Sequence, residues 1–114
     1  MIMSKAVKRG IKNAGKDTID EEIGEKDKAF VLFYATWCPF SRMFLPIFEE
    51  FARGNPEECI SFVVDDRPDV CEEYSIEYYP TVILFKKGKV SGRLDAKPGV
   101  GLNRNQLKGF TEKS

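Results

Sequence analysis

Histidine is absent from the 114 residues of this chain, and cysteine occurs only three times. The absence of histidine excludes Cys-His and Ser-His nucleophile pairs and removes the commonest metal ligand. Cys38, Cys59 and Cys71 form an odd set without a Cys-x-x-Cys pair, so we expect neither a disulfide framework nor a zinc site. The sequence therefore predicts no metal and no cofactor, and any acid–base chemistry must use carboxylates, lysine, tyrosine, cysteine or water.

The chain also lacks an excess of charge and a long apolar run. Eighteen basic side chains balance eighteen acidic ones, so we expect no overall electrostatic attraction to nucleic acid or to an anionic membrane. No apolar run approaches the roughly 18 residues that cross a bilayer, and residues 1–10 lack the apolar core of a signal peptide. We therefore expect a soluble protein of the reducing cytoplasm, with neither nucleic acid nor membrane as a partner.

The composition is that of a globular protein, with 42% hydrophobic and 12% aromatic residues. We divide the chain into an N-terminal helical extension, residues 1–28, and one domain, residues 29–114. An amphipathic helix with a basic face is predicted over residues 4–13. It is either a solvated helix packed on the domain or a membrane or nucleic-acid contact, although its apolar face is narrow for a membrane. A second short helix, capped by Asp17-Thr18, places Ile19 and Ile23 one turn apart.

The domain begins with a continuous apolar and aromatic run, residues 29–35, which predicts a buried strand. The longest amphipathic stripe of the chain follows over residues 40–51 and predicts a helix. Pro46 interrupts this stripe, but the apolar period continues on both sides, so we expect a bend rather than an end. Gly54-Asn55-Pro56 then ends the helix.

The rest of the chain predicts alternating strands and helices: a strand over residues 59–64, a short helix through Tyr74, and a hairpin of strands over 81–85 and 90–94. Asn103, with Gln106 three residues later, caps a last helix. This order predicts an α/β sandwich whose central strands are parallel and whose edge is antiparallel.

Cys38 is the candidate nucleophile. It follows the apolar strand and precedes Pro39, so it lies where a strand turns into a helix. The unpaired N–H groups and the positive end of the dipole at a helix N-terminus favour the thiolate over the thiol.

Four motifs, taken together, resemble the thioredoxin superfamily over roughly residues 29–112. They are Trp37-Cys38-Pro39-Phe40 where the family has Trp-Cys-x-x-Cys, Pro46 eight residues after the cysteine, Tyr79-Pro80-Thr81, and the turn Phe85-Lys86-Lys87-Gly88. The resemblance implies a thioredoxin fold, with a central mixed sheet of parallel core strands and an antiparallel C-terminal hairpin, flanked by helices.

The resemblance also implies a substrate groove. The Tyr79–Pro80 bond is expected to be cis and to bend the chain toward Cys38, leaving the Tyr79 backbone free to pair with an extended substrate. Trp37 and Phe40 would form an apolar platform beside the cysteine, with ordinary core packing as the alternative. The expected substrate-binding residues are thus Trp37, Pro39, Phe40, Tyr79 and Pro80. Asp65 is expected to accept a hydrogen bond from the Trp37 indole.

Several positions depart from the family pattern. Ser41 stands at the second active-site cysteine, and a serine hydroxyl cannot release a mixed disulfide at neutral pH. Leu32 and Ser61 replace the buried carboxylate and the lysine opposite it, which agrees with a natural monothiol Cys-Pro-Phe-Ser site. An engineered cysteine replacement at Ser41 is the alternative. We also hypothesise that Ser41 donates a hydrogen bond to the Cys38 thiolate. The loop over 95–100 is longer than in a typical thioredoxin.

Cys71 is expected on the helix that borders the active-site tryptophan. It would act as a displaced resolving thiol, link two copies of the chain, or be a half-buried residue without a role. Cys59 lies too far along its strand to reach Cys38 and is expected in the core.

The resemblance implies a thiol-disulfide oxidoreductase that forms mixed disulfides through Cys38, with Ser41 beside it. Its activity would be isomerisation, deglutathionylation or capture of a thiol client. The alternatives are a dithiol reductase whose second cysteine has been replaced and a non-catalytic peptide-binding module. The expected partners are protein or low-molecular-weight thiols and disulfides. We expect a monomer, or a dimer linked by a disulfide through Cys38 or Cys71.

Overall fold

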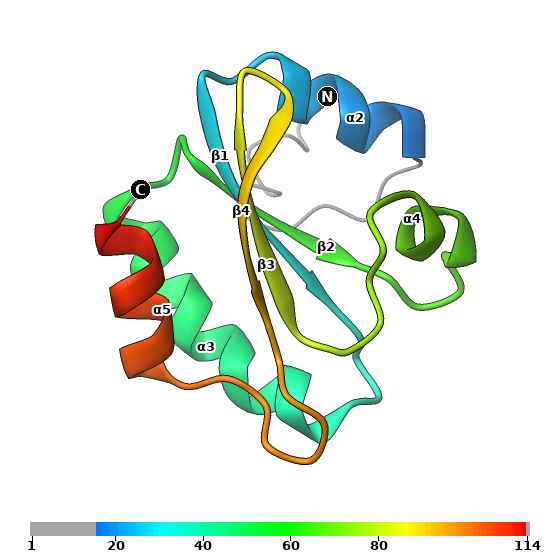
Figure 1. The fold of residues 1–114 in the computed structure, drawn as a ribbon, viewed down its shortest axis with the longest axis vertical. Coiled ribbons are helices and arrows are strands. Elements are labelled where there is room, and N and C mark those ends of the chain that lie inside the picture. Colours follow the sequence, from blue (N-terminus) through cyan, green and yellow to red (C-terminus); the bar gives the residue numbers. More distant parts are fainter. Residues whose placement is uncertain (1–15, 114) are drawn as a thin grey trace.

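The computed structural model describes residues 16–113, so the helix predicted over residues 4–13 lies outside the described residues. Figure 1 shows the helices and strands around one sheet. In chain order they are α2 (Lys16–Gly24), β1 (Lys28–Tyr34), α3 (Pro39–Gly54), β2 (Cys59–Val63), α4 (Pro68–Glu73), β3 (Thr81–Lys86), β4 (Lys89–Asp95) and α5 (Arg104–Glu112). Each predicted element within the described residues is present, with ends that differ from the predicted ones by a few residues at most.

The strands lie in the order β2-β1-β3-β4, and the sheet is mixed. β1 and β2 are parallel, whereas β3 is antiparallel to both β1 and β4. The α/β fold and the antiparallel hairpin are therefore confirmed.

The expectation that the central strands are parallel is wrong for β1 and β3. β3 starts at the end of β1, with Thr81 opposite Phe33. β1 and β2 are parallel and end at the same edge of the sheet, and the segment that contains the short helix α4 leads into β3 at that edge. β3 therefore runs antiparallel to β1.

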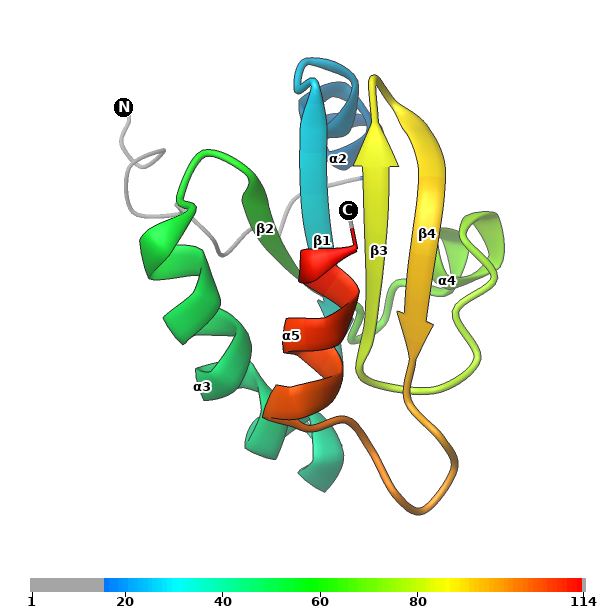
Figure 2. The ribbon, with the colours of Figure 1, turned by 60° about the vertical axis from the view of Figure 1, so that its left-hand side comes forward.

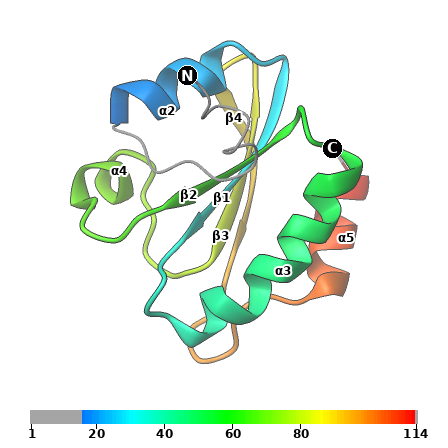
Figure 3. The same cartoon turned by 180° about the vertical axis from the view of Figure 1, so that it is seen from behind.

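Helices cover both faces of the sheet. On β1, Val31 and Phe33 pack with residues of α2 and α4, while Phe30 and Leu32 pack with residues of α3 and α5. Figures 2 and 3 show α3 and α5 together on one side and α2 and α4 on the other. Because successive side chains of a strand point to opposite faces, a strand that is apolar throughout must be covered twice.

The helix α3 continues through Pro46, as predicted. Phe44 and Phe48 on its inner face are fully buried against the sheet. This burial compensates for the backbone hydrogen bond that a proline cannot make. At the other end of the chain, Asn103 and Gln106 form the predicted capping box of α5.

The helix α2 packs on the same core as the strands. Ile19 and Ile23 are buried in the cluster that contains β1, β2 and α4, and the Tyr74 hydroxyl donates a hydrogen bond to the Asp20 carboxylate. The division of the chain at residue 28 stays a prediction.

Candidate active site

Cys38 lies where β1 ends and α3 begins. It is the N-cap residue of α3, with φ −92° and ψ 121°, and Pro39 follows in the first turn. Its backbone N–H donates to the Ala35 carbonyl at 3.2 Å, and its carbonyl accepts from the Arg42 N–H at 3.0 Å. These bonds fix the turn, and they leave the side chain 8% exposed at the end of the sheet.

The Tyr79–Pro80 peptide bond is cis, as predicted. It brings the backbone of Tyr79 to the thiol, since Cys38 Sγ lies 3.8 Å from the Tyr79 carbonyl oxygen and donates to it. Two segments that are 41 residues apart in sequence therefore meet at one sulfur atom.

The platform beside Cys38 consists of one exposed ring and one half-buried ring. Trp37 is 64% exposed, and its ring meets Tyr79 edge to face with 5.6 Å between centroids. Phe40 is half-buried and packs against the core cluster that contains Cys38, while Pro39 is exposed. Trp37 and Pro39 are thus open to a partner, whereas Phe40 has a partly structural place.

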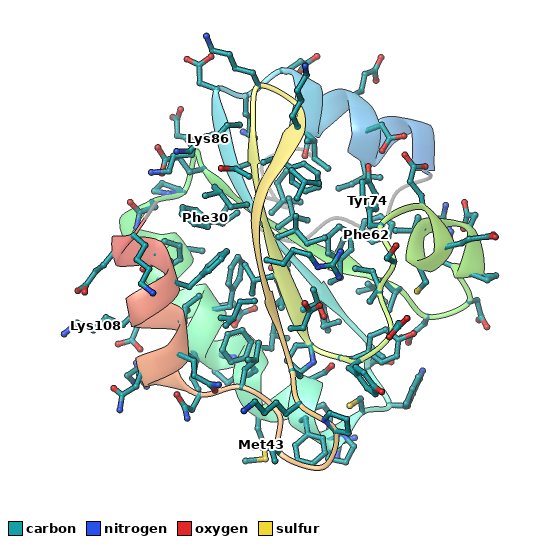
Figure 4. The ribbon with its side chains drawn as sticks, in the orientation of Figure 1. Phe30, Met43, Phe62, Tyr74, Lys86 and Lys108 are labelled. Carbon is teal, nitrogen blue, oxygen red and sulfur yellow. The ribbon has the colours of Figure 1, made fainter. Side chains whose placement is uncertain are left out.

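The loop after β4 adjoins this platform. The Ala96 N–H donates to the Pro80 carbonyl at 3.1 Å, which ties the loop to the cis-proline. At its other end Gly101, with φ +80°, lies so close to Phe40 that a Cβ there would be 2.8 Å from the ring. Figure 4 shows Met43, which is exposed, at this same end of the molecule. A cavity of about 410 Å³, lined by Tyr78, Arg93 and Lys97 among others, lies beside the loop.

Ser41 is fully buried, and its Oγ accepts a hydrogen bond from the Ala35 N–H at 3.2 Å. The hydroxyl thus holds the end of β1 against α3. Donation from this hydroxyl to a Cys38 thiolate stays a prediction.

Asp65 does not pair with the Trp37 indole, which corrects the expectation drawn from the family. Its carboxylate accepts hydrogen bonds from the Thr36 N–H at 3.0 Å and from the Thr36 hydroxyl. Asp65 therefore holds the residue before the tryptophan, and the indole remains exposed.

Residues 10–111 match the family model described as thioredoxin. The chain belongs to the thioredoxin family. A thioredoxin of Mycoplasmoides gallisepticum is 34% identical over 79 residues, which are 68% of this chain and 79% of that protein.

Human endoplasmic reticulum resident protein 44 is 38% identical over 85 residues, which are 68% of this chain. These residues are 21% of that protein, so this thioredoxin-family chain spans about a fifth of its length. Among solved structures, a cysteine-to-serine mutant of Entamoeba histolytica thioredoxin has 30% identity and a TM-score of 0.76, covering 91% of this chain and 97% of that one. Plasmodium falciparum thioredoxin has 27% identity and a TM-score of 0.77, with 90% and 96% covered.

This thioredoxin-family chain carries uncharged residues at the two positions where the family pattern has a carboxylate and a lysine. Leu32 and Ser61 lie directly opposite each other on β1 and β2, and both are buried. The expectation that Ser61 lies opposite Leu32 on the neighbouring strand is thus confirmed.

The three thiols of this family member have different surroundings. Cys59, at the start of β2, is buried as expected, and burial raises the pKa of its thiol to about 12. Cys71, on α4, is half-buried, and its Sγ lies 3.5 Å from the Tyr79 hydroxyl. Burial, together with the neighbouring Cys71, raises the pKa of Tyr79 to about 12.

Sequence reasoning missed three residues that build the thioredoxin-type site here. Thr36 donates a hydrogen bond to Asp65, and Gly101, without a side chain, leaves room for the Phe40 ring. Arg93 donates to the Tyr74 and Ser75 carbonyls and to Asp95, which holds the segment before the cis-proline to β4. Only Gly101 carried a signal, since it lies in a loop rich in proline and glycine. The other two depend on contacts between distant segments.

Among residues 16–113, no group of three or more His, Cys, Asp or Glu side chains is placed to hold a metal ion. Within the same range, none of the helices has the length and apolar character needed to cross a membrane.

Proposed function

We propose that this chain is a monothiol thiol-disulfide oxidoreductase that captures clients as mixed disulfides on Cys38. The Cys38 thiolate attacks one sulfur of a client disulfide, a Cys38–client disulfide forms, and the other client sulfur leaves as a thiolate. Ser41 cannot complete the reaction, because an alcohol has no accessible anion at neutral pH to attack the mixed disulfide. The adduct therefore persists until another thiol releases it.

The observation that carries the proposal is the position of Cys38 Sγ, 3.8 Å from the Tyr79 carbonyl oxygen. In the reduced state the thiol occupies the acceptor that an extended client would otherwise use. When Cys38 becomes part of a disulfide, it loses its proton and frees this carbonyl for a client N–H, a short piece of strand pairing. Trp37, Pro39 and Phe40 would contact the client on one side of the sulfur, and Tyr79 and Pro80 on the other.

Two further readings of the same site compete with this one. A peptide-binding module without chemistry is favoured by the exposed Trp37 ring beside a cysteine that is mostly covered. A dithiol reductase with a replaced cysteine is disfavoured, because Leu32 and Ser61 are both uncharged at positions where the family places charges.

The test is to incubate the wild type, Cys38→Ala and Ser41→Cys with a disulfide-bonded peptide and glutathione, with Cys59→Ala as a matched control. We expect the wild type and Cys59→Ala to hold the peptide covalently, Cys38→Ala to hold none, and Ser41→Cys to release it at least about tenfold faster. Non-reducing electrophoresis and mass spectrometry measure the adduct. An adduct in no variant would establish the binding module. Turnover by Ser41→Cys with no adduct held on the wild type would establish the replaced dithiol enzyme.

The finer assignments stay proposals. They are isomerisation, deglutathionylation or client capture as the activity, protein or low-molecular-weight thiols and disulfides as partners, and a monomeric state. A cytoplasmic location is likewise a prediction, and because one relative is an endoplasmic reticulum resident protein, imaging of the full-length protein is the measurement that checks it.

A further inference from the structure

Two of the three thiols contact the same tyrosine. Cys38 Sγ donates to the Tyr79 carbonyl oxygen at 3.8 Å, and Cys71 Sγ lies 3.5 Å from the Tyr79 hydroxyl. These cysteines are 33 positions apart in the chain, on the turn before α3 and on α4, so only the fold brings them to one residue. Cys59 provides the contrast, since it is buried on β2 and packs with α3 and the other strands rather than with Tyr79.

The surroundings of Cys71 suit a reactive thiol. Cys71 is half-buried rather than enclosed, and Tyr79 also meets the exposed Trp37 ring, so both cysteines border the surface on which a client of Cys38 would lie. The Tyr79 hydroxyl lies 3.5 Å from Cys71 Sγ and is placed to form a hydrogen bond with that sulfur.

We infer that Cys71 is the resolving thiol of this site. It would act in place of the second active-site cysteine of the family, at whose position this chain has Ser41. The inference rests on the proposed function of Cys38. The Cys71 thiolate attacks the Cys38 sulfur of the mixed disulfide, a Cys38–Cys71 disulfide forms, and the client sulfur leaves as a thiolate that takes up a proton. The client disulfide gains two electrons and the two cysteines lose them, so an external thiol, such as glutathione or a dithiol reductase, must reduce the new disulfide.

The position of Tyr79 makes this resolution slow. A disulfide requires Cβ atoms about 4 Å apart, and the two sulfurs here contact opposite ends of the tyrosine, its backbone carbonyl and its hydroxyl. The Tyr79 ring and the six-residue α4 must therefore move before the sulfurs can meet. A client is held for the time that this movement takes.

One equivalent of dithiodipyridine, a neutral aromatic disulfide, tests the inference. Each thiol-disulfide exchange releases one thiopyridone, which is followed by absorbance. The first release reports the loading of a thiol, and a second, first-order release without added thiol reports resolution within the same molecule. The variants to compare are Cys71→Ser, Cys59→Ala as the matched control, Cys38→Ala, and Ser41→Cys as the positive control with a neighbouring resolving thiol.

We expect the wild type and Cys59→Ala to show a second release whose rate is independent of protein concentration. Cys71→Ser should still load, but the rate of its second release should be at least about tenfold lower than that of the wild type. The second release of Ser41→Cys should be faster than that of the wild type. Peptide mapping of the wild-type product should show Cys38 joined to Cys71. Equal second releases in the wild type and Cys71→Ser, or a stable loaded wild type, would overturn the role of Cys71 while leaving capture by Cys38 intact. Failure of Cys71→Ser to load, since Cys38 is the thiol expected to react in that variant, would instead remove the proposed function.

Discussion

Ser41 Oγ has no exposed surface and accepts a hydrogen bond from the Ala35 N–H at 3.2 Å. The hydroxyl therefore replaces a sulfur in the motif and also satisfies a backbone donor at the end of β1. A buried N–H that loses its acceptor keeps its full cost of desolvation. Ser41 is consequently a structural residue of the turn that holds Cys38, whatever it contributes to the chemistry.

At the residue scale we predict that Ser41→Ala lowers the free energy of unfolding by about 1–3 kcal/mol, because the Ala35 N–H becomes buried and unpaired. Urea denaturation followed by circular dichroism measures this. Ser91→Ala, at an exposed position of β4, is the control and should change stability by less than about 0.5 kcal/mol. Equal effects of the two substitutions would show that the Ser41 hydrogen bond contributes nothing.

The loop between β4 and α5 connects two parts of the site. Ala96 binds the Pro80 carbonyl, and Gly101 lies against Phe40. Gly99 and Gly101 both have positive φ, +74° and +80°, which a residue with a side chain adopts only at a cost. They differ in what a side chain would meet: nothing lies within 4 Å of a Cβ on Gly99, whereas a Cβ on Gly101 would be 2.8 Å from the Phe40 ring.

At the element scale we predict that Gly101→Ala destabilises the protein more than Gly99→Ala. Both substitutions carry the backbone cost, about 1–2 kcal/mol, and only Gly101→Ala adds overpacking, which costs about 1–3 kcal/mol more. Urea denaturation of both variants measures the difference. In a protein that already carries Phe40→Ala, the ring is absent, so Gly101→Ala should no longer show this extra cost. An extra cost that persists without the ring would contradict the assigned contact.

The whole molecule depends on an apolar sheet covered on both faces, and this burial affects how stability varies with pH. Cys59 is 3% exposed, and burial raises the pKa of its thiol from 9.0 to about 12. The folded state thus keeps the proton that the unfolded state loses above pH 9. The stabilisation is complete below the unfolded pKa and is lost as the pH rises through the folded pKa.

At the scale of the whole molecule we predict that the free energy of unfolding falls between pH 9.0 and about 12. The Cys59 thiol should contribute up to about 1.4 kcal/mol per pH unit to this fall. Cys59→Ala is expected to be less stable at neutral pH but to show a shallower decline. Urea denaturation at a series of alkaline pH values compares the slopes. The raised pKa of Tyr79 adds a decline to both proteins, so only the difference between them belongs to Cys59. Parallel slopes would exclude the thiol as a cause.

Local patterns are enough to predict the helices and strands, because apolar period, proline, glycine and capping residues act within a few positions of one another. Examples are the amphipathic helix that continues through Pro46, the capping box formed by Asn103 and Gln106, and the apolar strand that leads to Cys38. The register that places Leu32 opposite Ser61 came from the family resemblance, as did the cis bond before Pro80.

Contacts between groups that are distant in sequence depend on the packing of the folded chain. β3 runs antiparallel to β1 because it starts at the edge where β1 ends, and Asp65 accepts a hydrogen bond from Thr36 rather than from the Trp37 indole. Likewise, no local sequence pattern predicts that Cys38 and Cys71 both contact Tyr79, one at its carbonyl and the other at its hydroxyl. The physical reason is that a strand or helix pattern states which face a side chain occupies, whereas a contact across elements depends on their packing and on the direction of each side chain.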